Sequence, residues 1–319
     1  MPEIKTVTVI GAGTMGRSIA CLILKKSLSV RLVDVDPSAL VNAGVFIRGD
    51  LAREFGDPVG TKNALSRLRT FSGLEEGVSA ADLVLEAVPE NLTLKREIFQ
   101  TIDRLCPPPV ILATNTSGLR ITDIARAATS HPRRIVGTHF YTPADLIPLV
   151  EVIKSDYTDP ETTLTVMSFL RTLGKDPVLV NQDIPGFIGN RLQHALAREA
   201  LSLLEKGVAG AGDIDKVARY ALGVRLVHTG PLEQRDLNGL DVHLAIAGYL
   251  YPELENRTEP SRILMGAVSA GHLGLKTGRG IYDWTGSTPE EVMARKNRQI
   301  MAVIGLLAEG GDGVGVPKP

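Results

Sequence analysis

The sequence of 319 residues predicts an α/β fold, with a mostly parallel, doubly wound sheet in the N-terminal part and an all-helical C-terminal domain. Three observations support this prediction. Short apolar segments alternate with longer helical patterns in the first half, as in sheets that helices cover on both faces. Helical periodicity dominates after residue 184. Glycine accounts for 32 residues, above its usual share of about 7%, which indicates tight turns or close backbone approaches.

The individual elements follow from hydrophobic periodicity. Strands are predicted from short apolar segments at 4–10, 30–33, 82–87, 110–113, 135–138, 149–153 and 177–180. Helices are predicted in the first half at 14–26, 38–55, 62–68, 92–105 and 160–173. In the second half they are predicted at 190–205, 213–221, 234–249 and 290–307.

A change of pattern marks a domain boundary. The segment Asp183-Ile184-Pro185-Gly186 places proline and glycine where strand signals stop, as is typical of boundaries between domains. The sequence therefore predicts a nucleotide-binding domain at 1–184 and a helical domain for substrate binding and dimerisation at 185–308. The glycine-rich end, 309–319, is expected to be disordered.

The composition excludes several classes of protein. A net charge of −1 and 44% hydrophobic residues argue against an electrostatic nucleic-acid binder and against a largely disordered chain. No apolar segment approaches the length of about 18 residues that a membrane span requires. Cys21 and Cys106 lie in apolar surroundings without metal-ligand spacing, so they are expected to be buried, reduced thiols. No signal peptide is visible, and a cytoplasmic protein without metal is expected.

A glycine-rich loop connects the first predicted strand to the first helix. Gly11, Gly13 and Gly16 fit the pattern G-x-G-x-x-G, which permits a tight turn, approach of a pyrophosphate and close packing of helix on strand. The amides and the dipole at the start of the helix then hold the phosphates. Asp34 follows at the end of the next strand, where a carboxylate accepts hydrogen bonds from a ribose and repels a 2′-phosphate. The loop therefore predicts NAD as the cofactor.

A second segment with candidate cofactor contacts begins at Glu86. It follows a strand at the carboxyl edge of the sheet, where ligands bind in such folds. Considered alone, Glu90 is expected to be a carboxylate at a helix start, and Lys95 is expected to lie on the solvated surface of that helix.

His139 and Glu151 are the candidate pair for proton transfer. Glu151 lies within an apolar strand, where a carboxylate is costly unless it is paired, and His139 follows the preceding strand. Oxidation of an alcohol requires loss of a hydride and of a proton, and a histidine can accept the proton while a carboxylate fixes its tautomer. The alternative is a core histidine in a structural ion pair, and spacing alone leaves both interpretations open.

Two polar residues have less specific contexts. Ser117 follows a predicted strand and can either hydrogen-bond a substrate oxygen or cap the helix after it. Asn190 lies near the start of the first helix of the second half, and by itself is expected to be a polar residue at a helix end.

Several ordered motifs together resemble the 3-hydroxyacyl-CoA dehydrogenase family, over residues 7–284. They are GAGTMG at Gly11, EAVPEN at Glu86, NTSGL at Asn115, GTHFYTP at Gly137, PLVEVI at Pro148, DIPGFIGNRL at Asp183, TGPLE at Thr229 and KTGRGIYDW at Lys276.

The resemblance implies an N-terminal Rossmann domain, a C-terminal domain that dimerises, and a small-molecule substrate. It implies that His139 is the general base, that Glu151 orients it, and that Ser117 and Asn190 hold the reacting oxygen. The cofactor-binding residues that it implies are Gly11, Gly13, Thr14, Met15, Gly16, Asp34, Ala87, Val88, Glu90, Lys95, Ser117, Thr142 and Lys276.

Three departures from the family pattern bear on the substrate. Thr142 stands where the family usually has asparagine, and Ile147-Pro148 stands where acyl-CoA members commonly have Met-Lys. The segment 36–69, in which acyl-CoA members carry lysines that bind the nucleotide of CoA, contains only one lysine, Lys62. The substrate class therefore stays open between a 3-hydroxyacyl-CoA and a free 3-hydroxy acid, as in lambda-crystallin and carnitine dehydrogenase-like members. There are two alternatives to this function. One is a dehydrogenase of a carboxylated aromatic alcohol or aldehyde, and the other is a non-catalytic, crystallin-like NAD-binding protein.

Overall fold

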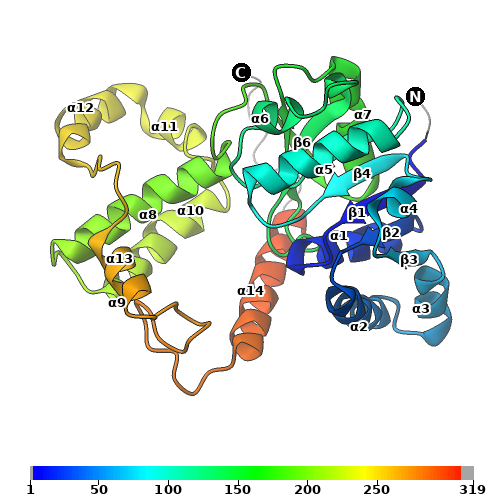
Figure 1. Cartoon of the computed structure of the whole chain (residues 1–319). Helices are drawn as coiled ribbons and strands as arrows, with labels where there is room; N and C mark the ends of the chain where they lie inside the picture. Colours follow the sequence, from blue (N-terminus) through cyan, green and yellow to red (C-terminus); the bar gives the residue numbers. More distant parts are fainter. Residues whose placement is uncertain (1–2, 310–319) are drawn as a thin grey trace. The chain divides into compact units, whose positions relative to one another are not determined.

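The computed structural model describes residues 3–309. The chain divides into two compact units, and the first, residues 1–191, contains one eight-stranded sheet (Figure 1). The strands are β1 (Thr6–Ile10), β2 (Ser29–Val33), β3 (Leu68–Phe71), β4 (Leu83–Glu86), β5 (Ile111–Thr114), β6 (Ile135–Phe140), β7 (Leu149–Lys154) and β8 (Asp176–Val180). Their order across the sheet is β3-β2-β1-β4-β5-β6-β7-β8. The order of the first six is that of a doubly wound nucleotide-binding fold, which confirms the predicted fold class.

Helices cover both faces of this sheet. They are α1 (Thr14–Lys25), α2 (Pro37–Phe55), α3 (Pro58–Leu65), α4 (Leu74–Val78), α5 (Leu92–Leu105), α6 (Ile121–Ala125), η1 (Pro132–Arg134) and α7 (Pro160–Thr172). One apolar cluster packs α1, α2 and α7 against the sheet, and a second packs α4, α5 and α6 against it. The interior strands β4, β5 and β6 are therefore buried on both faces, which explains the continuous apolar segments in the sequence.

The region after α3 differs from the sequence prediction. The helix predicted at 62–68 is wrong in its second half, because α3 ends at Leu65 and a strand, β3, begins at Leu68. Ser66 closes the helix, with its amide bonded to the carbonyl of Lys62. The strand was not predicted because it is short and lies at the sheet edge, with Arg69 and Thr70 exposed, so it carries little periodic signal. The helices α4 and α6 are also absent from the predicted ranges, because each has only five residues, too few to show a helical period.

The direction of the strands brings the candidate site residues together. β1, β2, β4, β5 and β6 run parallel, so their carboxyl ends share one edge of the sheet. β7 runs antiparallel to β6, and its register places Glu151 directly opposite His139. Residues that are opposite each other in an antiparallel pair have neighbouring side chains on one face.

The described part of the second unit, which begins at residue 192, is helical, as predicted. Its elements, with α8 beginning in the first unit, are α8 (Gly189–Glu205), α9 (Ala211–Val217), the π-helix η2 (Ala218–Gly223), α10 (Val224–Leu226), α11 (Glu233–Asn238), α12 (Leu240–Leu250), η3 (Tyr251–Glu253), α13 (Arg262–Ser269) and α14 (Pro289–Glu309). Within its described part, strand-like pairing is limited to isolated bridges at residues 274–283. The predicted tail, 309–319, lies outside the described residues except for its first position.

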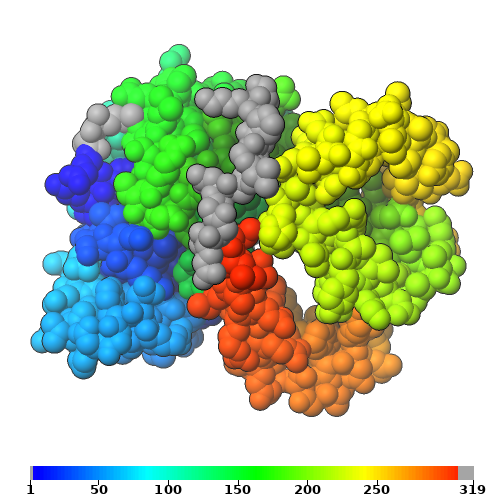
Figure 2. All heavy atoms as spheres, turned by 180° about the vertical axis from the view of Figure 1, so that it is seen from behind, coloured from blue at the N-terminus to red at the C-terminus, as the bar shows by residue number. Residues whose placement is uncertain are grey.

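The second unit has almost no buried core. Between residues 192 and 307 the buried side chains are those of Ser202 and Ser261, and no hydrophobic side chain in this range is buried. Figure 2 shows an open space between α14 (orange to red) and the green and yellow helices of the same unit. Polar contacts link α8 to the segment before α13: Arg257 pairs with Glu205 at 2.6 Å and with Glu255 at 2.8 Å. Among residues 3–309, no helix has both the length and the hydropathy of a membrane span.

Candidate active site

The glycine loop requires glycine at its first and third positions. Gly11 has a φ of +101°, and a Cβ atom there would lie 2.6 Å from the carbonyl oxygen of Ala87. A Cβ at Gly16 would overlap the carbonyl oxygen of Gly11. At Gly13, by contrast, no atom lies within 4 Å of the position that a Cβ would take. The loop is therefore closely packed on its inner side and open at its central glycine.

The loop and its surroundings fit the pyrophosphate and the adenosine ribose of NAD. Gly13 is the N-cap of α1, and among the described residues no side chain caps this helix and no acidic residue lies in its first turn. Its first amides are thus available to an anion. The Asp34 carboxylate lies at the same edge, where its Oδ2 accepts from the amide of Ala12 at 2.7 Å. Asp36 caps α2 through the amide of Ser38, so it is engaged elsewhere.

A buried ion pair lies beside this loop. Glu86, at the end of β4, is 0% exposed, and its Oε1 lies 2.7 Å from the Nζ of Lys95. Oε1 also accepts from the amide of Val88 at 2.7 Å, and Oε2 accepts from the hydroxyl of Thr114 at 2.6 Å. The expectation that Lys95 lies on a solvated surface is wrong, because its side chain is 1% exposed. The pair fixes the chain after β4 to the start of α5.

Glu90 holds the loop that follows β5. Its Oε1 accepts from the hydroxyl of Thr116 at 2.6 Å and from the amides of Ser117 and Gly118 at 2.9 and 3.0 Å. Burial alone would raise the pKa of Glu90, but these hydrogen bonds and the charge of Lys95, 3.5 Å away, hold the pKa below its usual value. From its position alone, Glu90 was expected to be a carboxylate at the start of the helix. It does not cap α5, because the N-cap is Asn91, whose side chain accepts from the amide of Leu94.

His139 and Glu151 form a buried pair. The Nδ1 atom of His139 lies 2.8 Å from Oε2 of Glu151, and both side chains are at most 5% exposed. A carboxylate can only accept, so Nδ1 is the donor and the proton of the neutral ring lies there. Among residues 3–309, Nε2 of His139 has no hydrogen-bond partner. Nε2 is therefore free to accept a hydrogen bond or a proton.

Four donors surround the Glu151 carboxylate. Oε1 accepts from the amides of Ile188 and Gly189, both at 2.9 Å, and Oε2 accepts from the hydroxyl of Tyr141 at 2.9 Å as well as from His139. Burial raises the pKa of Glu151, but these hydrogen bonds outweigh burial and the pKa lies below its usual value. Glu151 is therefore ionised at neutral pH and can stabilise a protonated imidazole.

Ser117 and Asn190 are joined to the same network. The side-chain amide of Asn190 donates to the backbone carbonyl of Ser117 at 2.6 Å, and Asn190 directly follows Gly189, whose amide binds Glu151. Ser117 does not cap the helix after it, because the Asp183 carboxylate accepts from the first amides of α6. A chain of contacts thus runs from His139 to Glu90 at one edge of the sheet.

The remaining predicted residues lie in several places. Thr14 and Met15 begin α1, and the hydroxyl of Thr142 lies 3.1 Å from the Sδ of Met15. Ala87 and Val88 run beside the glycine loop, since the amide of Ala87 donates to the carbonyl of Ile10 at 2.7 Å. Lys276 belongs to the second unit, where its side chain is exposed in the turn after α13.

Sequence reasoning missed three contributors to this site: Tyr141, Glu86 and Asp183. Each had a signal. Tyr141 stands two positions after His139, so strand alternation places both side chains on one face. Glu86 ends an apolar strand, and Asp183 stands next to the domain boundary. A carboxylate in such a position requires a buried partner.

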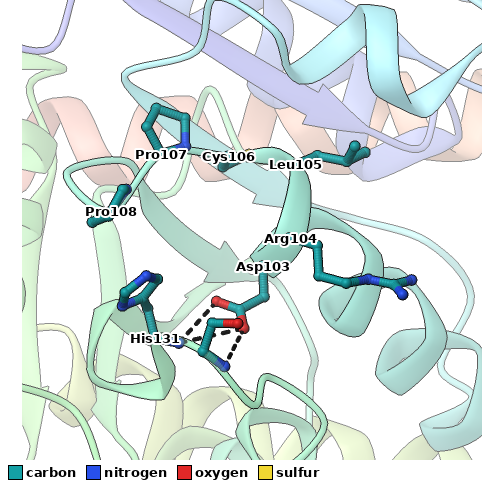
Figure 3. A pocket seen from close by; sticks show the side chains of 8 residues that line it. Asp103, Arg104, Leu105, Cys106, Pro107, Pro108 and His131 are labelled. Carbon is teal, nitrogen blue, oxygen red and sulfur yellow. Dashed lines mark hydrogen bonds between the residues drawn. The ribbon is translucent and has the colours of Figure 1, made fainter.

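The depression in Figure 3 is separate from these residues. It lies between the end of α5 and the segment before β6, at the amino edge of the sheet. Its buried carboxylate, Asp103, accepts from the amides of Ser130 and His131 and pairs with Arg134 at 3.0 Å. These groups satisfy each other and join the chain segments. Among the described residues, no cluster of three or more His, Cys, Asp or Glu side chains is arranged to hold a metal ion.

The chain is also similar to known proteins along most of its length. The family model "3-hydroxyacyl-CoA dehydrogenase, NAD binding domain" matches residues 6–184, and the model of the C-terminal domain of the same family matches residues 186–284. A probable 3-hydroxybutyryl-CoA dehydrogenase of Bacillus subtilis is 40% identical over 90% of this chain and 99% of its own length.

A second relative extends further along the chain. The 5-formyl-3-hydroxy-2-methylpyridine 4-carboxylate 5-dehydrogenase of Mesorhizobium japonicum is 34% identical over 95% of this chain and 98% of its own length. A crystal structure of an enzyme of that name, described as an NAD+-dependent dismutase, covers 96% of this chain and 99% of its own chain with a TM-score of 0.88. The chain therefore belongs to the 3-hydroxyacyl-CoA dehydrogenase family and is an NAD-dependent oxidoreductase.

Proposed function

We propose that this enzyme oxidises a hydroxyl group beta to a carbonyl or carboxylate, with His139 as the general base. The observation that carries the proposal is the buried contact of 2.8 Å between Nδ1 of His139 and Oε2 of Glu151. It leaves Nε2 as the atom that takes the hydroxyl proton. The ionised Glu151 then stabilises the imidazolium that forms.

The other residues of the network position the reactants. When bound, NAD supplies the acceptor for the hydride that leaves the substrate carbon. Gly11, Gly13 and Gly16 admit its pyrophosphate and Asp34 binds a ribose. Ser117 and Asn190 orient the reacting oxygen, and Glu90 holds the loop that carries Ser117. Lys95 acts through Glu90, since its Nζ already faces Glu86, Glu90 and the carbonyl of Val88.

Replacement of the base tests this assignment. We expect His139→Gln to lower kcat/KM for alcohol oxidation by about 10²- to 10⁴-fold, the usual contribution of a general base. The matched control is His131→Gln, an exposed histidine at the opposite edge of the sheet. Initial rates of NADH formation measure both. Activity of His139→Gln within tenfold of wild type would show that another group takes the proton.

A carboxylated aromatic alcohol or aldehyde is the second candidate substrate. It is favoured by the similarity to the pyridine carboxylate dehydrogenase, which extends over 95% of this chain, whereas the similarity to the 3-hydroxybutyryl-CoA dehydrogenase covers 90%. Initial rates on paired substrates decide between the classes: 3-hydroxybutyrate against its CoA ester, and a 5-formylpyridine carboxylate against its hydroxymethyl form. If no hydroxy acid, hydroxyacyl-CoA or aromatic substrate is turned over, a non-catalytic NAD-binding role is favoured.

We also propose that the enzyme is a cytoplasmic homodimer formed through the helical unit. The exposed apolar side chains of α12, among them Leu240 and Leu244, support the dimer. The location is supported by two buried free thiols, Cys21 and Cys106, which suit a reducing compartment.

A further inference from the structure

Tyr141 shares an acceptor with the base. Its hydroxyl donates to Oε2 of Glu151 at 2.9 Å, and Nδ1 of His139 approaches the same oxygen at 2.8 Å. The rings of Tyr141 and His139 lie side by side, with their centroids 4.6 Å apart. One carboxylate oxygen therefore serves two donors, and the two interactions compete for its electron density.

The position of this hydroxyl is closely defined. A Cβ atom at Gly189 would overlap it, so glycine at the start of α8 leaves the space that the hydroxyl occupies. Burial and the hydrogen bond to Glu151 raise the pKa of Tyr141. The hydroxyl therefore stays protonated over the physiological range and remains a donor.

We propose that Tyr141 is a positioning residue that sets how strongly Glu151 stabilises the protonated form of His139. The inference rests on the proposed role of His139 as the base. When His139 takes a proton, its contact with Glu151 becomes an ion pair, which is stronger the more negative charge Oε2 carries. A second donor on Oε2 withdraws part of that charge. Tyr141 thus weakens the stabilisation that Glu151 gives to the protonated imidazole of His139.

Few groups face this cluster. They are His139 from β6, Glu151 from β7, and the backbone amides of Ile188 and Gly189 before and at the start of α8. Among residues 3–309, no other charged side chain forms a hydrogen bond or ion pair with Tyr141 or Glu151. Removal of the Tyr141 hydroxyl therefore changes one hydrogen bond to Glu151 and leaves its other three donors in place.

Titration of the imidazole tests the inference without a substrate. In protein labelled at histidine with 13C and 15N, the signal of His139 is identified by its loss in His139→Gln. We expect Tyr141→Phe to move the titration midpoint of that signal to higher pH by about half a unit or more, because the loss of the hydroxyl leaves more negative charge on Oε2 of Glu151. Tyr157→Phe, which removes a hydroxyl that contacts Arg126 at the surface, is the matched control and should leave the midpoint unchanged.

Kinetics give a second readout. In Tyr141→Phe, the acid limb of kcat/KM for oxidation and the alkaline limb for reduction should both move to higher pH. Gly189→Ala, which displaces the hydroxyl but keeps the ring, should move the midpoint in the same direction. An unchanged midpoint in both variants overturns the inference. If the midpoint moves but His139→Gln remains active, the positioning role stands and the proposed catalytic role fails.

Discussion

Lys175 is a buried cation that has no carboxylate partner in hydrogen-bond contact within the described part of the chain. Its Nζ donates to the carbonyl of Ile147 at 2.8 Å and to that of Asp145 at 3.4 Å, in the loop between β6 and β7. Burial lowers the pKa of Lys175 to about 8 from the usual 10.5. This loop joins the strand of His139 to the strand of Glu151, so Lys175 fixes the connection between base and partner.

The lowered pKa predicts how stability depends on pH. Below pH 8 Lys175 is charged in the folded and the unfolded chain, and the cost of burying that charge, about 3 kcal/mol, is fully present. Between pH 8 and 10.5 the unfolded chain binds more protons, so the free energy of unfolding rises with pH. Lys175→Met should remove this rise.

Urea unfolding at several pH values between 7 and 10.5 measures the effect, and the exposed Lys62→Met is the control. The free energy of unfolding of Lys175→Met relative to that of wild type should fall with pH across this window. A difference that is constant with pH would show that the lysine titrates normally.

The residue types at the site were largely predictable, but their contacts were not. His139 and Glu151 were found because a carboxylate in an apolar strand needs a partner, and a chain reversal brings a histidine to it. Lys95 was misjudged because a lysine on an amphipathic helix usually faces water. Its burial depends on Glu86, which stands nine residues earlier at the end of β4, and the path of the loop between β4 and α5 brings the two side chains together.

At the scale of elements, β3 depends on a side chain from its neighbour. Arg31 of β2 donates to the carbonyls of Gly77 and Glu76 at 2.8 and 2.6 Å, and its guanidinium lies 4.2 Å from the centre of the Phe71 ring. These contacts hold the edge strand and the α4 segment together. The strand has four residues, of which two are exposed, and this is also why its sequence did not predict it.

Removal of this side chain should weaken the edge. We expect Arg31→Ala to lower the free energy of unfolding by about 1–3 kcal/mol, since it removes two hydrogen bonds from a charged donor and a cation–π contact. Arg69→Ala, an exposed arginine of β3 itself, is the control and should change it by less than about 0.5 kcal/mol. Equal effects of the two substitutions in urea unfolding would contradict the anchoring role.

At the scale of the molecule, the two units differ in how they are stabilised. Residues 3–191 contain two apolar clusters, one on each face of the sheet, whereas no hydrophobic side chain is buried between 192 and 307. Periodicity predicted most of the longer helices of both units. It did not predict α13, and the helix predicted at 234–249 divides into α11 and α12 at Gly239, whose φ is +91°. Periodicity could not show what covers the apolar faces of the second unit, because no element between residues 192 and 307 buries them.

A second copy of the chain is the covering surface that we expect. α12 exposes Leu240 and Leu244, 63% and 75% exposed, one turn apart on one face, and an apolar stripe on a helix normally packs against another surface. Sedimentation velocity over a range of concentrations should show a dimer for wild type. The double variant Leu240→Glu and Leu244→Glu should raise the dissociation constant at least tenfold, equivalent to about 1.4 kcal/mol. Leu164→Glu, a comparably exposed leucine of α7, should leave it unchanged. A wild-type protein that sediments as a monomer at every concentration would refute the dimer.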